Sequence, residues 1–122
     1  MTEVFRTQPI PADYFPPLDA LPRFLLPREI EYPPYLNAAE ALLDGALARG
    51  WGDLPAFHQD GQTTTYAALA SRTNRLANGL RELGISLGDR VIVRMHDSPD
   101  LVATVLAIMR IGAVAIPTYT LF

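Results

Sequence analysis

One stretch of this sequence limits the possible folds more than any other: residues 101–111, which are almost uniformly apolar. Drawn as a helix that begins at Pro99, the stretch carries apolar side chains around its whole circumference. Only Asp100, Thr104 and Arg110 are polar exceptions in this helix. A helix that is apolar on every side is buried on several sides. The other elements expected here offer it one sheet surface and one neighbouring helix. We therefore expect this helix to lack cover, and the chain to be part of a larger domain.

Short β-prone runs lie on either side of this helix. Residues 90–95 are predicted to form one strand, and residues 113–116 a buried strand that Pro117 ends. Ser98 is the expected N-cap residue of the helix, with Pro99 at its first position. Strand, helix and strand in this order form a βαβ unit, so the two strands should be parallel. The expected fold class is therefore α/β.

Two further helices are expected before this unit. The first follows Asn37, a capping residue with Glu40 at the capping-box position, and ends at Gly50. The second follows Thr65 and runs to about Leu83. Apolar positions three and four residues apart predict one buried side on each helix. These positions are Leu42, Leu43, Ala46 and Leu47 in the first helix, and Leu69, Ala70, Thr73, Leu76, Ala77, Leu80 and Leu83 in the second.

Asp60 and Gly61 separate two short runs, residues 55–59 and 62–65. Asp-Gly between β-prone runs is a strong signal for a tight hairpin. The threonines at 63–65 supply β-branched side chains for its second strand. The alternative for such a run, a phosphate cradle, needs glycine-rich flanks or a lysine, and both are absent. We therefore predict a β-hairpin here.

Residues 1–35 are predicted to form an extended, proline-rich arm. Eight of the eleven prolines lie there, and proline fixes φ and removes a backbone donor, which excludes a regular helix or a central strand. The arm also carries Phe5, Tyr14, Phe15, Phe24, Tyr32 and Tyr35. We interpret it as a segment packed over a folded body; a solvated tail and a proline-rich ligand for a partner domain are the alternatives. Residues 36–122 would then form a partial α/β subdomain.

Composition excludes several classes of function. The chain of 122 residues has a net charge of −3, whereas nucleic acids and anionic membranes favour cationic partners. All ten basic residues are arginine, which excludes a phosphate-binding or Schiff-base lysine. There is no cysteine, and two histidines, His58 and His96, are too few for a zinc cluster. The N-terminus lacks the pattern of a secretory signal and the longest apolar run is far below the ~20 residues of a spanning helix, so we expect a cytoplasmic location and no membrane partner.

Residues 84–88 match the G-x-S-x-G pattern of a hydrolase nucleophile, and Asp89 and His96 follow in the order of a catalytic triad. That mechanism requires a turn from a strand into a helix. Here a helix precedes a strand, and Asp89 and His96 are too close in sequence to approach the serine from different loops. We interpret residues 84–88 as a helix-to-strand connection that uses its glycines for turns.

The remaining polar candidates have simpler explanations. His96 beside Asp97 is the residue pair of a general base, but also of a surface hydrogen-bonding pair at a strand-to-helix turn, which we favour. Arg72, Arg75 and Arg81 form a partial basic stripe that we interpret as a solvated helix face. The sequence therefore assigns no catalytic, cofactor-binding or metal-binding residue to this chain.

A series of short motifs runs in order through the folded part. It comprises Thr-Tyr-Ala-Ala-Leu at 65–69, Asn-Arg-Leu-Ala at 74–77 with Leu80 and Gly84, Gly-Asp-Arg-Val at 88–91, Ser-Pro-Asp at 98–100, Ala-Ile at 107–108, Gly-Ala-Val at 112–114, and Pro117. With this spacing, residues 32–122 resemble the start of the adenylate-forming superfamily, which includes acyl- and aryl-CoA synthetases and peptide-synthetase adenylation domains. Within it, residues 32–40 and 117–121 resemble benzoate- and 2-aminobenzoate-CoA ligases. Residues 95–97 depart from the many members that place asparagine before Ser-Pro.

This resemblance implies that the chain is the incomplete N-terminal portion of the large domain of an AMP-forming acid:CoA ligase. Such enzymes join a carboxylic acid to ATP and then transfer the acyl group to CoA. The family's phosphate loop, acid pocket and catalytic lysine would lie beyond residue 122. ATP, Mg and CoA would therefore belong to the full-length parent, and this chain would be inactive alone. Its partner would be the remainder of its own polypeptide, and residues 99–111 with the C-terminal run would also allow self-association.

A protein of another class is the alternative. It would be a stand-alone, non-enzymatic α/β interaction module that docks through the apolar helix at 99–111 and the C-terminal run.

Overall fold

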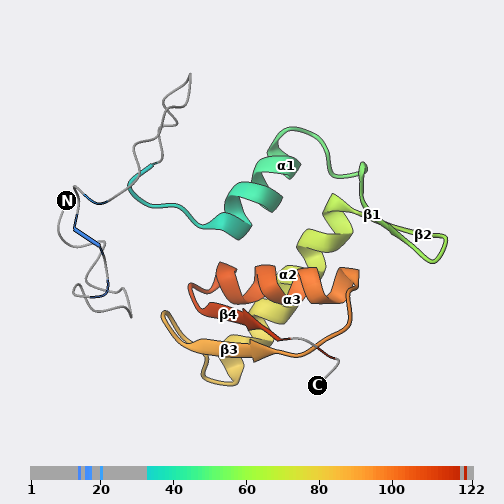
Figure 1. The fold of residues 1–122 in the computed structure, drawn as a ribbon. Coiled ribbons are helices and arrows are strands. Elements are labelled where there is room, and N and C mark those ends of the chain that lie inside the picture. The colour runs from blue at the N-terminus through green and yellow to red at the C-terminus, as the bar shows by residue number, and fades with distance from the viewer. Residues whose placement is uncertain (1–13, 15, 18–19, 21–32, 119, 121–122) are drawn as a thin grey trace. The chain divides into compact units, whose positions relative to one another are not determined.

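The computed structural model describes residues 14, 16–17, 20, 33–118 and 120 (Figure 1). It contains two compact units, Met1–Leu36 and Asn37–Phe122. In the first unit, Tyr14 and Tyr35 are exposed. The predicted packing of the proline-rich arm concerns mainly residues outside the described part, so it stays a prediction.

The second unit has the predicted α/β organisation. Its elements are η4 (Glu40–Asp44), α1 (Gly45–Ala48), β1 (Pro55–Gln59), β2 (Gln62–Thr65), α2 (Tyr66–Glu82), β3 (Arg90–Val93), α3 (Pro99–Arg110) and β4 (Val114–Pro117). Strands β1 and β2 pair antiparallel, and β3 and β4 pair in parallel on either side of α3 in sequence. The register of the parallel pair runs from Arg90 opposite Val114 to Val93 opposite Pro117. The hairpin and the βαβ unit are both confirmed.

The local signals in the sequence act where they were expected. Asp60 and Gly61 have φ of 50° and 74°, the two left-handed positions of a hairpin turn whose twist matches its strands. The Thr65 hydroxyl accepts a hydrogen bond from the Ala68 N–H at 3.2 Å and caps α2. The Ser98 hydroxyl accepts one from the Leu101 N–H at 3.2 Å and caps α3. These side chains satisfy backbone donors that a helix start leaves unpaired.

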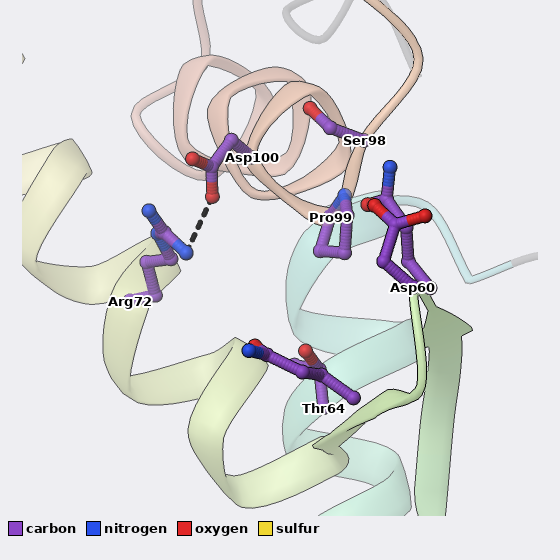
Figure 2. A pocket seen from close by; sticks show the side chains of 8 residues that line it. Asp60, Thr64, Arg72, Ser98, Pro99 and Asp100 are labelled. Carbon is purple, nitrogen blue, oxygen red and sulfur yellow. Dashed lines mark ion pairs between the residues drawn. The ribbon is translucent and has the colours of Figure 1, made fainter.

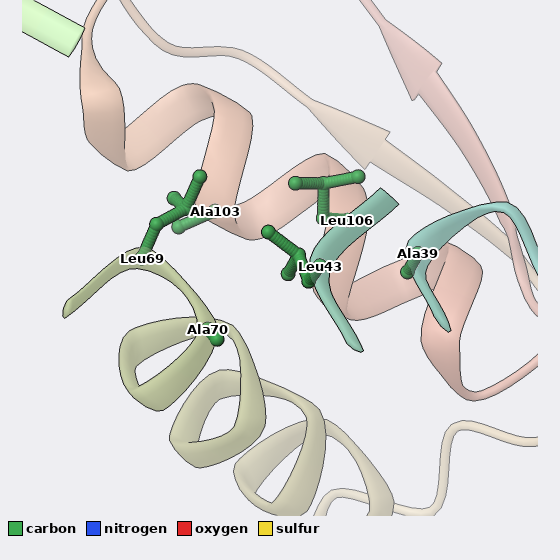
Figure 3. Packing of buried hydrophobic residues seen from close by; sticks show 6 residues of the cluster. All are labelled: Ala39, Leu43, Leu69, Ala70, Ala103 and Leu106. Atoms are coloured by element: carbon green, nitrogen blue, oxygen red, sulfur yellow. The ribbon is translucent and has the colours of Figure 1, made fainter. Parts of the chain in front are cut away.

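Two apolar clusters hold the second unit together. The first lies where η4, α2 and α3 meet, and Figure 3 shows Leu43 of η4 between side chains of the two helices. Its buried members are Ala39, Leu43, Leu69, Ala70, Ala103 and Leu106. The second lies between α2, α3 and the β3–β4 sheet, with Ala77, Val93, Ala107, Ile108, Ile111 and Ala113 buried. Alanine recurs on both helices in these clusters, and such small side chains allow α2 and α3 to approach closely.

The expectation that the apolar helix lacks cover is wrong. Within residues 101–111, only Met109 is exposed, at 39%. Three neighbours cover α3: helix α2, the β3–β4 sheet, and η4 through Leu43. The sequence pattern showed that the helix needed cover, but it did not show that the first helical segment would return to provide it.

Three predictions of burial are also wrong. Leu83, expected on the buried side of the second helix, lies at the C-cap of α2 and is 79% exposed. In the first helical segment, Leu42 and Leu47 are exposed, whereas Ala39, Leu43 and Ala46 are buried. The buried side follows steps of four and three residues, so the period was right but the predicted apolar side was too wide.

The strand predicted to be buried at 113–116 carries exposed Val114 and Ile116. Part of the apolar surface left exposed in the second unit therefore lies on this sheet.

Polar contacts fasten the first helical segment to the end of α3. The Asn37 side-chain oxygen accepts hydrogen bonds from the Ala39 and Glu40 N–H groups, while its amide nitrogen donates to the Met109 and Arg110 carbonyls at 3.2 and 3.1 Å. Asn37 thus caps the start of one helix and the end of another. The Arg110 guanidinium also bonds both carboxylate oxygens of Asp44, at 3.0 and 2.7 Å.

The buried side of α3 should dominate the stability of this unit. Ile108 is fully buried at 0% exposure, whereas its neighbour Met109 is the exposed residue of the same helix turn. We expect Ile108→Ala to lower the free energy of unfolding by about 2–5 kcal/mol, because it removes buried methylenes and leaves a cavity. Met109→Ala, the matched control, should cost well under half as much. Urea denaturation followed by circular dichroism measures both, and equal losses would contradict this packing.

Asn37 offers a second test, since its two functions can be separated. Asn37→Ser keeps a capping oxygen but is too short to reach the α3 carbonyls, whereas Asn37→Ala loses both functions. The unfolding free energy should fall in the order wild type, serine, alanine, with a cap worth about 0.5–2 kcal/mol. If the serine variant equals wild type, the bond to the end of α3 contributes nothing.

Candidate functional site

A polar hollow lies between the tip of the hairpin, α2 and the start of α3 (Figure 2). Its volume is about 290 Å³. The residues that line it are Gln59, Asp60, Gln62, Thr64, Arg72, Ser98, Pro99 and Asp100. The hairpin supplies half of them because its turn folds the strand ends back toward α2, and the Ser98 cap fixes the start of α3 opposite.

The charges of this hollow do not suit a nucleotide phosphate. Figure 2 shows the Arg72 guanidinium of α2 directed at the Asp100 carboxylate of α3, with which it forms an ion pair. Asp60 adds a second carboxylate. Because the one guanidinium in the lining is already matched by a carboxylate, no positive charge remains there for a triphosphate. These residues do not fit ATP.

Arg75, the next residue of the predicted basic stripe, bonds the Ser71 hydroxyl on its own helix at 2.7 Å. Arg72, Arg75 and Arg81 are all exposed on the side of α2 away from the core. The interpretation of this stripe as a solvated face is confirmed, with one addition: Arg72 links α2 to α3.

The G-x-S-x-G match is the helix-to-strand connection predicted for it. Residues 84–88 join α2 to β3, and Gly84 and Gly88 adopt left-handed φ of 88° and 83°. The Ser86 hydroxyl and the Ser86 N–H both donate to the Asp89 carboxylate, at 2.9 and 2.8 Å. A hydroxyl that donates to a carboxylate inside one turn is part of that turn's structure. The triad interpretation therefore fails on geometry as well as on order.

The pKa of the Asp89 carboxyl in this connection is shifted from its ordinary value. Hydrogen bonds from the Ser86 backbone N–H, and secondarily from its hydroxyl, lower the pKa of Asp89 below its ordinary value of 3.8. The Asp89 backbone carbonyl accepts a hydrogen bond from the Val114 N–H at 2.7 Å, which joins this turn to β4. The charge of the hydrogen-bonded carboxylate therefore stabilises the turn that leads into β3.

The two histidines lie apart on the surface. His58 Nδ1 is 2.9 Å from the Thr63 hydroxyl across the hairpin, and His96 and Asp97 are both exposed between β3 and α3. Among the residues that the structure describes, no group of three His, Cys, Asp or Glu side chains is placed to hold a metal ion. Within the same residues, no helix is both long and apolar enough to cross a bilayer.

The family model of AMP-binding enzymes matches residues 46–122 of this chain, from α1 to the C-terminus. That match covers more than half of the sequence and includes the hairpin and the βαβ unit. The chain belongs to the AMP-binding enzyme family. The predicted resemblance to adenylate-forming enzymes is therefore confirmed, and so is the α/β fold as a part of their N-terminal domain.

Known AMP-binding proteins match this chain over a small part of their own length. A 3-hydroxybenzoate–CoA/4-hydroxybenzoate–CoA ligase of Thauera aromatica is 44% identical over 81 residues, which is 66% of this chain and 16% of the ligase. The anthranilate CoA ligase AuaEII, solved with anthranoyl-AMP, has a TM-score of 0.67 at 25% identity over 75% of this chain and 17% of its own. The N-terminal subdomain of Klebsiella oxytoca NpsA has a TM-score of 0.64 at 31% identity, over 71% of this chain and 23% of its own.

Sequence reasoning missed the polar hollow and the Arg72–Asp100 pair. These two residues lie in different helices, and the hairpin tip that completes the hollow lies in a third element. Opposite charges on two helices are too common in sequences to indicate a pair. The pair follows from the packing of α2 against α3, which depends on the alanines between them.

Asp89 gives a pH-dependent prediction. Because its pKa is lower in the folded chain, its charge stabilises the fold above the ordinary value of 3.8, and this contribution is lost as pH falls through the lower folded value. The stability difference between wild type and Asp89→Asn should therefore be largest near neutral pH and shrink in acid. Urea denaturation across the acid range measures it.

Ser86→Ala is the matched control for this titration. It removes the hydroxyl donor but keeps the backbone N–H, the larger cause of the lowered pKa, so the pH-dependent part of the stability should fall only partly. A difference between wild type and Asp89→Asn that stays constant over pH would contradict this account.

Proposed function

We propose that this chain is the N-terminal scaffold segment of an ATP-dependent, AMP-forming carboxylic acid:CoA ligase. The observation that supports this most is the match of residues 46–122 to AMP-binding enzymes, together with 44% identity to an aromatic acid:CoA ligase. An aromatic acid such as a benzoate or 2-aminobenzoate is the proposed substrate class. It rests on the hydroxybenzoate and anthranilate ligases among the similar proteins.

The chemistry is proposed to lie in the rest of the polypeptide. We propose no catalytic, ATP-binding, Mg-binding or CoA-binding residue in residues 1–122, of which 1–35 would be the arm and 36–122 the partial subdomain. Two observations support this: the chain has no lysine, and the arginine in its polar hollow is matched by Asp100. ATP, Mg and CoA would be used by the complete enzyme, in the cytoplasm where these substrates are supplied.

The alternative, a stand-alone interaction module, required the apolar helix together with the C-terminal run as its docking surface. Helix α3 is instead covered by α2, η4 and the sheet. With the helix internal and the family assigned, the ligase segment is the better account of the same residues.

The proposal is tested on the polypeptide that the complete reading frame encodes. We expect it to catalyse exchange between pyrophosphate and ATP that depends on an aromatic acid, with benzoate, 3-hydroxybenzoate and 2-aminobenzoate as the first substrates. Acyl-CoA should form when CoA is added. Residues 1–122 alone should give no exchange and no heat of ATP binding in calorimetry.

Two results would refute the proposal: a complete polypeptide that activates no carboxylic acid, or tight ATP binding by residues 1–122 alone. An aliphatic acid as the preferred substrate would refute only the assigned substrate class.

A further inference from the structure

One face of the β3–β4 sheet is both apolar and exposed. Ile92 on β3 is 70% exposed, and its register partner Ile116 on β4 is 37% exposed. Val114, two residues before Ile116, is 39% exposed. Successive strand residues point to opposite faces, so these three side chains share one face, here called the outer face. It is the side of the sheet away from Val93.

The inner face of the same two strands packs against the helices. Val93 and Ala113 are buried in the cluster with α2 and α3, and Val91 and Ala115 pack against that cluster. Figure 1 shows α3 lying along one side of the two strands. Parallel sheets occur almost only where both faces are covered, because helical crossovers pack on them. A two-stranded parallel sheet with one bare face is therefore incomplete.

A second copy of this chain is a poor occupant for the outer face. It offers three apolar side chains on two four-residue strands, and exposed Arg90, the register partner of Val114, lies on the same face. A stable dimer buries about 800 Å² on each partner, from about 20–30 residues. The outer face alone is too small for that, but it suits one helix of the same polypeptide, which pays no entropy of association.

We infer that a helix from the polypeptide segment following Phe122 packs on Ile92, Val114 and Ile116. This inference rests on the proposed function, because it requires the rest of the ligase. The similar proteins supply the chain length: the Thauera aromatica ligase is matched over 16% of its length, so most of it lies outside the match. The outer face is then an intramolecular interface, and residues 1–122 are completed by burying it.

Single thiols test this directly, since residues 1–122 contain no cysteine. Ile92→Cys and Ile116→Cys place a thiol on the outer face of the complete polypeptide. Leu83→Cys is the matched control, because Leu83 is 79% exposed at the end of α2 and lies outside the two strands. Alkylation of each thiol by iodoacetamide is followed by mass spectrometry in native buffer and in concentrated urea.

We expect the thiols introduced by I92C and I116C to react at least tenfold more slowly than that of L83C in native buffer, and all three equally in urea. Rates at 92 and 116 equal to that at 83 in a folded protein would overturn the inference. Protection that disappears on dilution, as a dimer dissociates, would also overturn it and assign the face to a second copy. Slow amide hydrogen exchange of residues 90–94 in the unsubstituted protein gives a second readout if a variant fails to fold.

The two proposals can fail separately. Protected thiols in a polypeptide that activates no acid would leave the interface standing and refute the ligase. Acid activation by a polypeptide with reactive thiols at 92 and 116 would refute the interface alone.

Discussion

The burial of α3 is the constraint on which the rest of this structure depends. A helix with apolar residues around its circumference must be enclosed, and three different parts of the chain enclose it: α2, the β3–β4 sheet and the η4 segment. The cost of exposing it would be large, since each fully buried aliphatic side chain is worth about 1.5–3 kcal/mol. The positions of the other elements follow from this requirement, and so does the short distance between α2 and α3.

Polar groups set the register that apolar packing leaves undefined. Asn37 and Asp44 attach the first helical segment to the last turn of α3, and the Arg72–Asp100 pair connects α2 to its first turn. Apolar contacts have no direction, so they alone would allow η4 to slide along α3. Hydrogen bonds to the carbonyls at the end of a helix have a fixed geometry and prevent this. Both ends of α3 are thereby fixed.

Membership in the AMP-binding family indicates a function for this segment, whereas the polar hollow and the surface residues by themselves indicate none. Thr65, Ser86, Ser98 and the Arg72–Asp100 pair are engaged in caps, a turn and an ion pair, which are structural tasks. In the proposed ligase, such a segment would present a surface to the remainder of the polypeptide. The outer face of the sheet is one part of the surface at which apolar side chains are exposed.

The sequence by itself determined the elements and their local geometry. Asp60-Gly61 specified the hairpin turn, Thr65 and Ser98 specified two helix starts, and the apolar runs around α3 specified a parallel βαβ unit, because each signal acts within a few residues of itself. Tertiary structure alone decided which apolar residues are buried. The sequence could not show that η4 returns to cover α3, that Leu42 beside buried Leu43 is exposed, or that Ile116 faces outward. Burial depends on contacts between residues distant in sequence, and no local pattern contains the position of the partner.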